Sequence, residues 1–169
     1  MNKKLETANA EKVKRKVANL LKEYGFKRTK KTFYTRVLDD RIEFIHIHKF
    51  TFGPLFRVHI GIRFLCDEFD AVALNGPDSD SYRNNNKSVS VKYWLEEESL
   101  DRCANEILEY IKEVGLIWLE KWGNVDLLLT SAHSPLKGDM SEQYKKMVRG
   151  DGDVQVHQRS LALLEIKSP

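Results

Sequence analysis

Three of the chain's five histidines lie within fourteen positions, in the stretch "FIHIHKFTFGPLFRVHIGIRF" (44–64). A His-x-His pair on one strand and a third histidine on the antiparallel neighbour can surround one zinc ion, leaving a fourth position for water. His46, His48 and His59 have this spacing. Interpreted as a metal site, the stretch indicates a metal-dependent hydrolase. Interpreted as a surface, it indicates a place where another molecule binds.

Charged residues in the same stretch argue against the metal interpretation. Arg57 and Arg63 share the parity of His59, so they lie on its side of a strand, where fixed positive charge disfavours a dication. Glu43 has the parity opposite to His46, so no carboxylate of this hairpin orients an imidazole from behind. We therefore expect no metal and no cofactor, and the hydrolase is the least favoured of three functional alternatives.

Alternation of apolar residues predicts a two-stranded hairpin that turns through Gly53 and Pro54. A loop of two or four residues pairs positions whose numbers sum to 107, which places His48 opposite His59. This pairing gathers one apolar face, and a shift by one residue would expose its isoleucines. The residues of that face are Ile45, Ile47, Val58, Ile60 and Ile62.

The other face of the hairpin mixes aromatic and basic side chains. Aromatic rings beside arginine are typical anchors of protein interfaces, so we predict that this face binds a partner. The alternative is that a C-terminal helix covers it and makes it part of the core. The predicted binding residues are Phe44, His46, His48, Phe50, Arg57, His59 and Arg63.

The surrounding pattern predicts an α+β fold: an N-terminal helix, an antiparallel sheet of about four strands, a long helix after the sheet and further C-terminal helices. We expect one domain over residues 1–169, with a helix at 9–24, the sheet at 31–95 and a helical part at 99–167. Within the sheet region, 67–87 is expected to be a mobile loop. The strands are expected at 32–37, 41–51, 56–65 and 88–95.

Three local signals set the expected helix ends. Gly25 suits a left-handed cap on the first helix. Ser99 is the expected N-cap of the long helix, and Gly115 either interrupts or ends it. Short helices are expected near 125–134 and 139–148, and a terminal helix is expected to pack through Leu161, Leu164 and Ile166.

Composition is that of a globular chain, with 41% hydrophobic and 10% aromatic residues. No apolar run is long enough to cross a membrane, and the start "MNKKLETANAEKVKRK" is not expected to be a secretory signal. Cys66 and Cys103 stand far apart, which favours free thiols in a cytoplasmic protein.

Charge is segregated along the chain. Residues 1–36 hold twelve Lys and Arg against three Glu, whereas the rest holds sixteen against twenty-two acidic residues. This basic segment raises nucleic-acid binding as an alternative, with Tyr24, Phe26 and Tyr34 available for stacking on bases. A solvated amphipathic helix followed by an edge strand explains the same charges.

The segments "YGFKRTKKTFYTR" and "FTFGPLFRVHIGIRF" resemble a bacterial family known only as a domain of unknown function. The resemblance covers roughly residues 10–120 and implies a bacterial α+β domain; it brings no activity and no functional residues.

Other motifs of chemistry are weak. "PDSDSYRNNN" and "RGDGDV" lack the ordered ligands of a calcium loop, and no nucleophile elbow or phosphate-binding glycine loop occurs. We therefore expect a cytoplasmic protein-binding domain rather than an enzyme, of the kind exemplified by an immunity-type inhibitor of a toxin. No membrane partner is expected.

Overall fold

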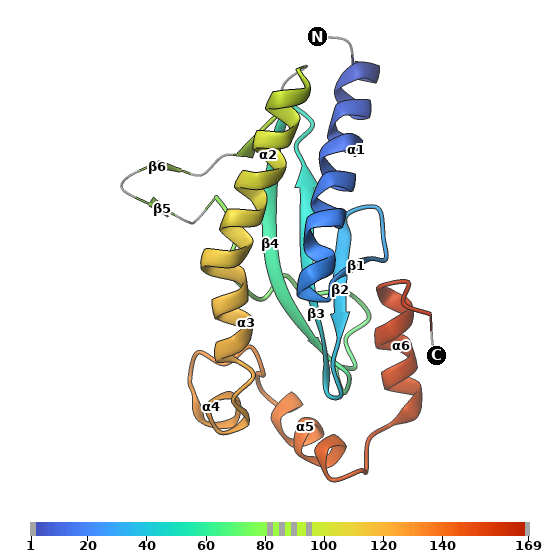
Figure 1. Ribbon diagram of the computed structural model, residues 1–169. Helices are drawn as coiled ribbons and strands as arrows, with labels where there is room; N and C mark the ends of the chain where they lie inside the picture. The colour runs from blue at the N-terminus through green and yellow to red at the C-terminus, as the bar shows by residue number, and fades with distance from the viewer. Residues whose placement is uncertain (1–2, 81–82, 85–86, 89–90, 94–95, 168–169) are drawn as a thin grey trace.

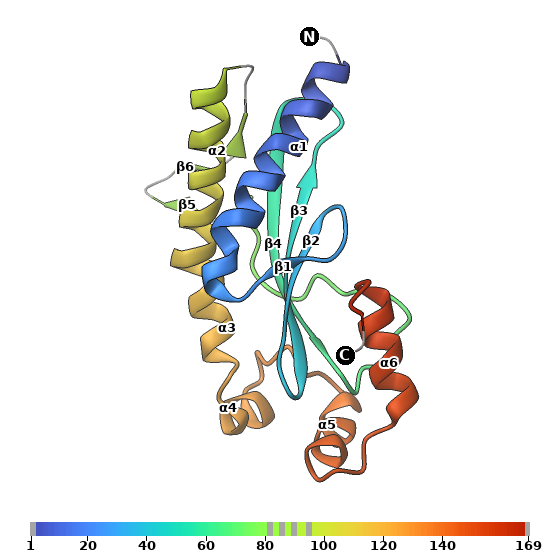
Figure 2. The same cartoon turned by 45° about the vertical axis from the view of Figure 1, so that its right-hand side comes forward.

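The computed structural model of the chain describes residues 3–80, 83–84, 87–88, 91–93 and 96–167. It confirms the predicted α+β class: helices α1 (Lys3–Leu20) and α2 (Glu97–Tyr110) lie side by side on one face of an antiparallel sheet, and α6 (Val154–Leu163) lies on the other (Figures 1 and 2). We call these the inner and the outer face. None of the helices in the described part of the chain combines the length and apolar character needed to cross a bilayer.

The sheet has the strand order β1-β2-β3-β4-β7, with every neighbouring pair antiparallel. Its strands are β1 (Lys27–Arg28), β2 (Phe33–Val37), β3 (Arg41–Lys49), β4 (Leu55–Phe64) and β7 (Val91–Lys92). The two-residue β1 was not predicted. A separate ladder pairs β5 (Arg83–Asn84) with β6 (Lys87–Ser88). The strand predicted over 88–95 includes residues 89–90 and 94–95, which lie outside the described residues.

The register of β3 and β4 corrects the predicted one by two residues. Paired positions sum to 105, so His46 faces His59 and His48 faces Arg57. The turn comprises residues 51–54 and is closed by a 3.0 Å hydrogen bond from Phe50 N to Leu55 O. Because a shift of two preserves the parity of every side chain, the two predicted faces are those observed.

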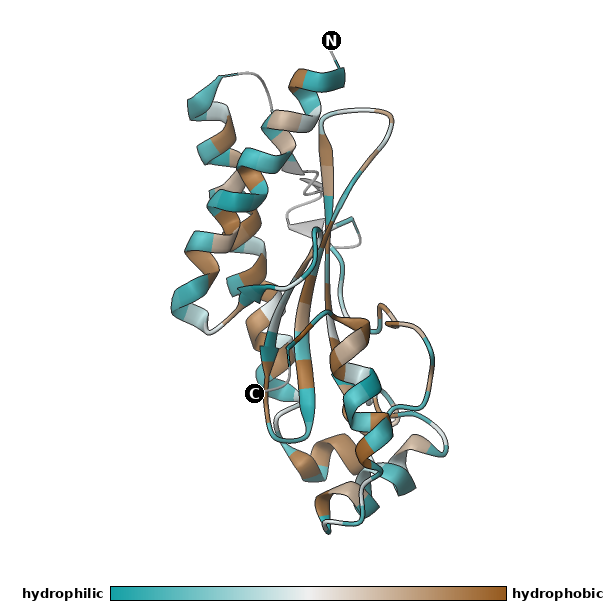
Figure 3. Cartoon of the chain, turned by 90° about the vertical axis from the view of Figure 1, so that its right-hand side faces the viewer, coloured by the Kyte–Doolittle hydropathy of each residue, from teal (hydrophilic) through white to brown (hydrophobic). Residues whose placement is uncertain are grey.

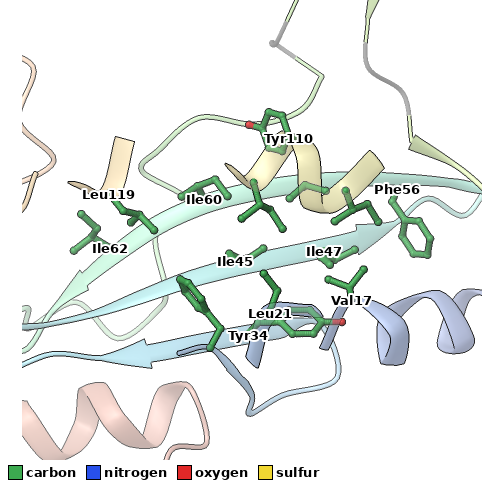
Figure 4. Packing of buried hydrophobic residues seen from close by; sticks show 14 of the residues in the cluster. Val17, Leu21, Tyr34, Ile45, Ile47, Phe56, Ile60, Ile62, Tyr110 and Leu119 are labelled. Atoms are coloured by element: carbon green, nitrogen blue, oxygen red, sulfur yellow. The ribbon is translucent and has the colours of Figure 1, made fainter. Parts of the chain in front are cut away.

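The inner face forms the main core. Ile45, Ile47 and Ile60 point at α1 and at the long helix, where Val17, Leu21 and Tyr110 meet them (Figure 4). All are buried, and the other two predicted members of this face, Val58 and Ile62, are buried with them.

Gly115 does not end the long helix. The helix widens to π geometry over Ile111–Leu116 and continues as α3 (Ile117–Lys121). A Cβ atom at Gly115 would stand 2.8 Å from Ile60 Cδ1, so the glycine lets the helix approach the sheet closely. The predicted cap of this helix was wrong: it begins at Glu97, and Ser99 lies inside its first turn because Glu96 already has extended backbone.

The first helix begins six residues before its predicted start but ends as predicted. A 3₁₀ turn, η1 (Leu21–Tyr24), follows α1, and Gly25 adopts φ +80°. Phe26 N then donates to Leu21 O at 3.2 Å, which completes the predicted helix ending.

The C-terminal helices are α4 (Val125–Thr130), α5 (Met140–Val148) and α6. Asp153 caps α6 by accepting from Gln155 N at 2.8 Å. As predicted, the terminal helix packs through Leu161 and Leu164, which form a second cluster with Ile42 and Leu65 and have Ile166 beside them.

Part of the loop predicted to be mobile is held along the free edge of β4. Asn75 bonds the backbone N and O of Ile62 through its side chain, at 3.0 and 2.8 Å. Ile60 N donates to Pro77 O at 3.0 Å, and Ser79 pairs with Val58 through backbone and hydroxyl. Residues 76–79 therefore act as an extra edge segment of the sheet, and the mobility predicted for 67–87 stays a prediction. Residues 81–82 and 85–86 of the same loop lie outside the described residues.

Candidate binding surface on the outer sheet face

Helix α6 divides the outer face into a covered end and an open end. In Figure 3 helices α1 and α2 lie to the left of the sheet and α6 lies beside its lower part, whereas no helix lies to the right of the sheet near the β3–β4 turn. Exposure follows the same division, since Ile42 and Phe44 are fully buried whereas His48 is exposed. The alternative that a C-terminal helix covers this face therefore holds for one end, and the other end is left exposed; partner binding there stays a prediction.

Two of the predicted binding residues lie in the covered end. Arg63 is 1% exposed and donates to Ser160 Oγ at 3.0 Å, Ala71 O at 2.8 Å and Asp67 O at 2.6 Å. The ring of Phe44 lies over Gly61, its partner on β4. In this conformation neither side chain can reach a partner, because helix α6 and the 67–71 segment bind Arg63 and because Phe44 is fully buried.

The other five predicted residues form the open end, where aromatic rings follow one another along β3. The ring centroids of His46 and His59 are 5.6 Å apart, and those of His48 and Phe50 are 5.4 Å apart. Phe50 continues to Phe52 at 4.9 Å, at the turn. Phe33 of β2 lies 4.5 Å from His46. We call Phe33, His46, His48, Phe50, Phe52 and His59 the aromatic ladder.

Phe52 was missed as a binding residue. It is 76% exposed, the highest value among the exposed large hydrophobic side chains of the described residues. The sequence interpretation treated "FTFGPLF" only as a turn. The signal that could have identified it is that Phe52 follows Phe50 at period two, in a segment too short to enclose its ring.

The fifth open residue, Arg57, is occupied by the chain's own carboxylates. Its Nη2 atom lies 3.1 Å from Asp78 Oδ1, and its Nε atom lies 3.4 Å from Asp80 Oδ2. Asp78 belongs to the segment held along β4, and Asp80 follows that segment and donates its backbone N–H to Asp78 Oδ1 at 2.9 Å. This edge of the open end therefore presents two carboxylates around one guanidinium.

The opposite edge of the open end carries a cationic pocket. Strand β2 starts at Phe33 while β3 runs on to Lys49, and the gap between β3 and α1 forms a pocket of about 600 Å³. Four cationic side chains and one carboxylate line it. The lining residues are Thr7, Ala10, Glu11, Lys14, Arg28, Lys31, Thr32, His48 and Lys49. We call it the edge pocket.

Two histidines of the ladder, His46 and His59, favour the neutral state. Burial lowers the pKa of His46 to about 4, with His59, His48 and Lys14 contributing in the same direction. Burial also lowers the pKa of His59, and Arg57 adds to that shift. The Nδ1 atom of His46 is buried without a hydrogen-bond partner in the described structure. At neutral pH the middle of the open end is therefore aromatic and uncharged.

The three imidazoles are not arranged around one point. His46 and His59 stack at an interplanar angle of 28°, so their in-plane nitrogen lone pairs run along nearly parallel planes. Throughout the residues that the structure describes, no three His, Cys, Asp or Glu side chains are placed to hold a metal ion.

The cysteines do not form a nucleophilic site. Cys66 and His157 line one shallow pocket beside α6, but burial raises the pKa of the Cys66 thiol to about 11. Burial raises the pKa of Cys103 to about 12. A thiol with such a pKa stays protonated at neutral pH and is a poor nucleophile. Both cysteines are free.

Several residues of the basic N-terminal segment form ion pairs within the fold. Lys16 binds Glu97 at 2.8 Å and Asp101 at 2.7 Å, both on α2. Arg28 binds Glu11 at 2.6 Å. Phe26 and Tyr34, proposed above to stack on bases, are 1% and 0% exposed. These two are core residues, so the nucleic-acid surface predicted on this segment loses two of its three stacking groups, and Tyr24 is left half-buried.

No family model matches the chain, and no match was found among curated proteins or solved structures. The resemblance to a bacterial domain family stays a prediction.

Proposed function

We propose that the chain is a non-enzymatic protein-binding domain whose partner docks on the open end of the outer face. The observation that carries this proposal is the aromatic ladder, which leads from the buried face to Phe52 in solvent. Aromatic anchors with an exposed apolar tip stabilise an interface when a partner removes them from water.

The charges beside the ladder favour a protein over a nucleic acid. One edge is the cationic edge pocket, whereas the other presents Asp78 and Asp80. A protein can complement both signs at once, but a phosphate backbone would be repelled at the acidic edge. The partner that fits best has an apolar side chain over Phe52.

An immunity-type inhibitor is the finer role that we propose within this class. Such a protein covers the active site of a toxin and needs an exposed binding face rather than catalytic groups. Opposite charges at the two edges would raise the rate of association with a partner of complementary charge. This role places the protein in the bacterial cytoplasm, where both cysteines would remain reduced.

The experiment is a comparative pull-down from the source organism with three baits. They are the wild-type chain, Phe52→Ser, and the matched control Phe69→Ser, which removes an exposed phenylalanine (61%) away from the ladder. We expect one protein to be retained by wild type and Phe69→Ser and lost with Phe52→Ser. Equal retention by all three baits would show that the ladder is not the interface. Inhibition of the recovered protein at a 1:1 ratio tests the finer role.

Nucleic-acid binding is tested with the same purified proteins. A labelled single-stranded oligonucleotide should show no retention at moderate salt. Retention that falls steeply with salt and is insensitive to Phe52→Ser would favour the nucleic-acid alternative.

A further inference from the structure

The edge pocket contains a buried lysine without a close acidic partner. Lys14 is 4% exposed, because α1 turns it toward the sheet between the buried residues Val13 and Val17. Its Nζ atom lies 3.9 Å from Glu11 Oε2, which is beyond hydrogen-bond distance. Among the described residues, no hydrogen bond of this ammonium group is found.

Glu11 is committed to other cations. Arg28 donates to both of its oxygens, at 2.6 and 3.1 Å, and Arg15 Nε donates at 3.4 Å. The hydrogen bonds of Arg28 are the main reason why the pKa of Glu11 lies below its usual value. One carboxylate thus serves three cations, and Lys14 is the most distant of them.

The remaining cations repel Lys14. Burial lowers the pKa of Lys14 most; Glu11 opposes this shift, while Arg28, Lys31 and Lys49 add to it. Lys49 is neutralised by Glu6 at 2.5 Å, but Lys31 is exposed at the rim of the pocket. Burying an ammonium group without a close anion is unfavourable, so the pocket is poised to accept an anion.

We propose that the edge pocket binds a small phosphate ester, with its phosphoryl group between Lys14, Lys31 and the Thr32 hydroxyl. A phosphate dianion offers three acceptor oxygens, and two ammonium groups and a hydroxyl supply the donors. The Thr32 hydroxyl has no hydrogen bond within the described part of the chain. A pocket of about 600 Å³ exceeds the needs of inorganic phosphate and suits a small molecule, whose remainder would extend toward His48.

The test is a titration of the full chain with inorganic phosphate and with glycerol phosphate at constant ionic strength, followed by calorimetry and thermal unfolding. Glutarate serves as the carboxylate arm. We expect both phosphates to bind and to raise the midpoint of thermal unfolding. Glycerol phosphate should bind more tightly than inorganic phosphate, and glutarate should bind at least ten-fold more weakly than glycerol phosphate.

Two variants and one control test the assignment to Lys14. Lys14→Met keeps roughly the length of the side chain and should weaken the binding of glycerol phosphate at least ten-fold. Lys31→Met changes an exposed residue, so it reports on the pocket even if Lys14→Met does not fold. The control Lys12→Met removes a lysine of α1 that pairs with Glu97 instead, and it should leave binding unchanged.

Several outcomes would overturn the proposal. The first is that neither phosphate binds. The second is that Lys31→Met and wild type bind glycerol phosphate with equal affinity. The third is that glutarate binds as tightly as the phosphates do. A phosphoserine peptide that binds more tightly than glycerol phosphate would assign the pocket to a modified protein instead. The proposal is separate from partner docking, because Phe52→Ser should leave phosphate binding intact.

Discussion

Between neutral and mildly acidic pH, we expect the free energy of unfolding to fall because of His46. Its pKa is about 4 in the folded chain, against the usual 6.5 in the unfolded chain. The groups that act on it are its own burial, His59, His48, Lys14 and Lys30. Between these two pKa values the unfolded state binds a proton that the folded state does not, so stability is lost as the pH falls.

The size of this loss of stability depends little on the pKa of His46 in the folded chain. From about pH 7.5 to about pH 5.5, a group that titrates at 6.5 only when unfolded contributes a loss of roughly 1.4 kcal/mol. His46 is only partly buried, so solvent screening reduces this to about 1 kcal/mol. Carboxylates with lowered pKa, such as Asp40, add their losses mainly below this window.

The assay is urea unfolding at both pH values for wild type, His46→Phe and the control His133→Gln. Phenylalanine keeps the stack with Phe33 and removes the buried Nδ1 atom. His133 is exposed in a loop, so its variant should resemble wild type. We expect His46→Phe to lose about 1 kcal/mol less than wild type, with the remaining loss due to His59. An equal loss in all three proteins would refute the reasoning.

Three further changes test the packing. Gly61→Ala would place a Cβ atom 2.2 Å from the ring of Phe44, so we expect a loss of about 3 kcal/mol in urea unfolding, and a loss near zero would contradict the described packing. Leu164→Ala should lower the free energy of unfolding by about 3 kcal/mol and speed amide hydrogen exchange in α6, because this fully buried side chain holds α6 on the sheet. Unchanged exchange would show that other contacts hold α6 in place. Asp153→Ala removes the cap of α6 and should cost about 1 kcal/mol, measurable as a lower thermal midpoint, whereas an unchanged midpoint would show that this cap contributes little.

The alternation of side chains explains why the two faces could be predicted. Every second residue from Phe56 to Phe64 is apolar, and burial rejects any register that mixes the faces. The exact register could not be predicted, because a four-residue turn at 51–54 and one at 52–55 give the same faces. The hydrogen bond between Phe50 and Leu55 decides between them in the structure.

The open and covered ends could not be predicted for a different physical reason. They depend on where α6 crosses the sheet, and that position results from Leu161 and Leu164 contacting residues about a hundred positions earlier. Similarly, the edge pocket joins Lys14, Lys31 and His48, which no local pattern links. Pairing of the basic segment with α2 is also a long-range contact, so the charge count alone overstated its free positive charge.

The affinity of the recovered partner, measured by calorimetry, tests the central claim most directly. We predict that Phe52→Ser raises the Kd at least ten-fold, since truncating an aromatic anchor of an interface typically costs more than about 1.4 kcal/mol. Phe69→Ser should change the Kd less than about two-fold. Equal Kd values for wild type and Phe52→Ser would contradict docking on the open end of the outer face.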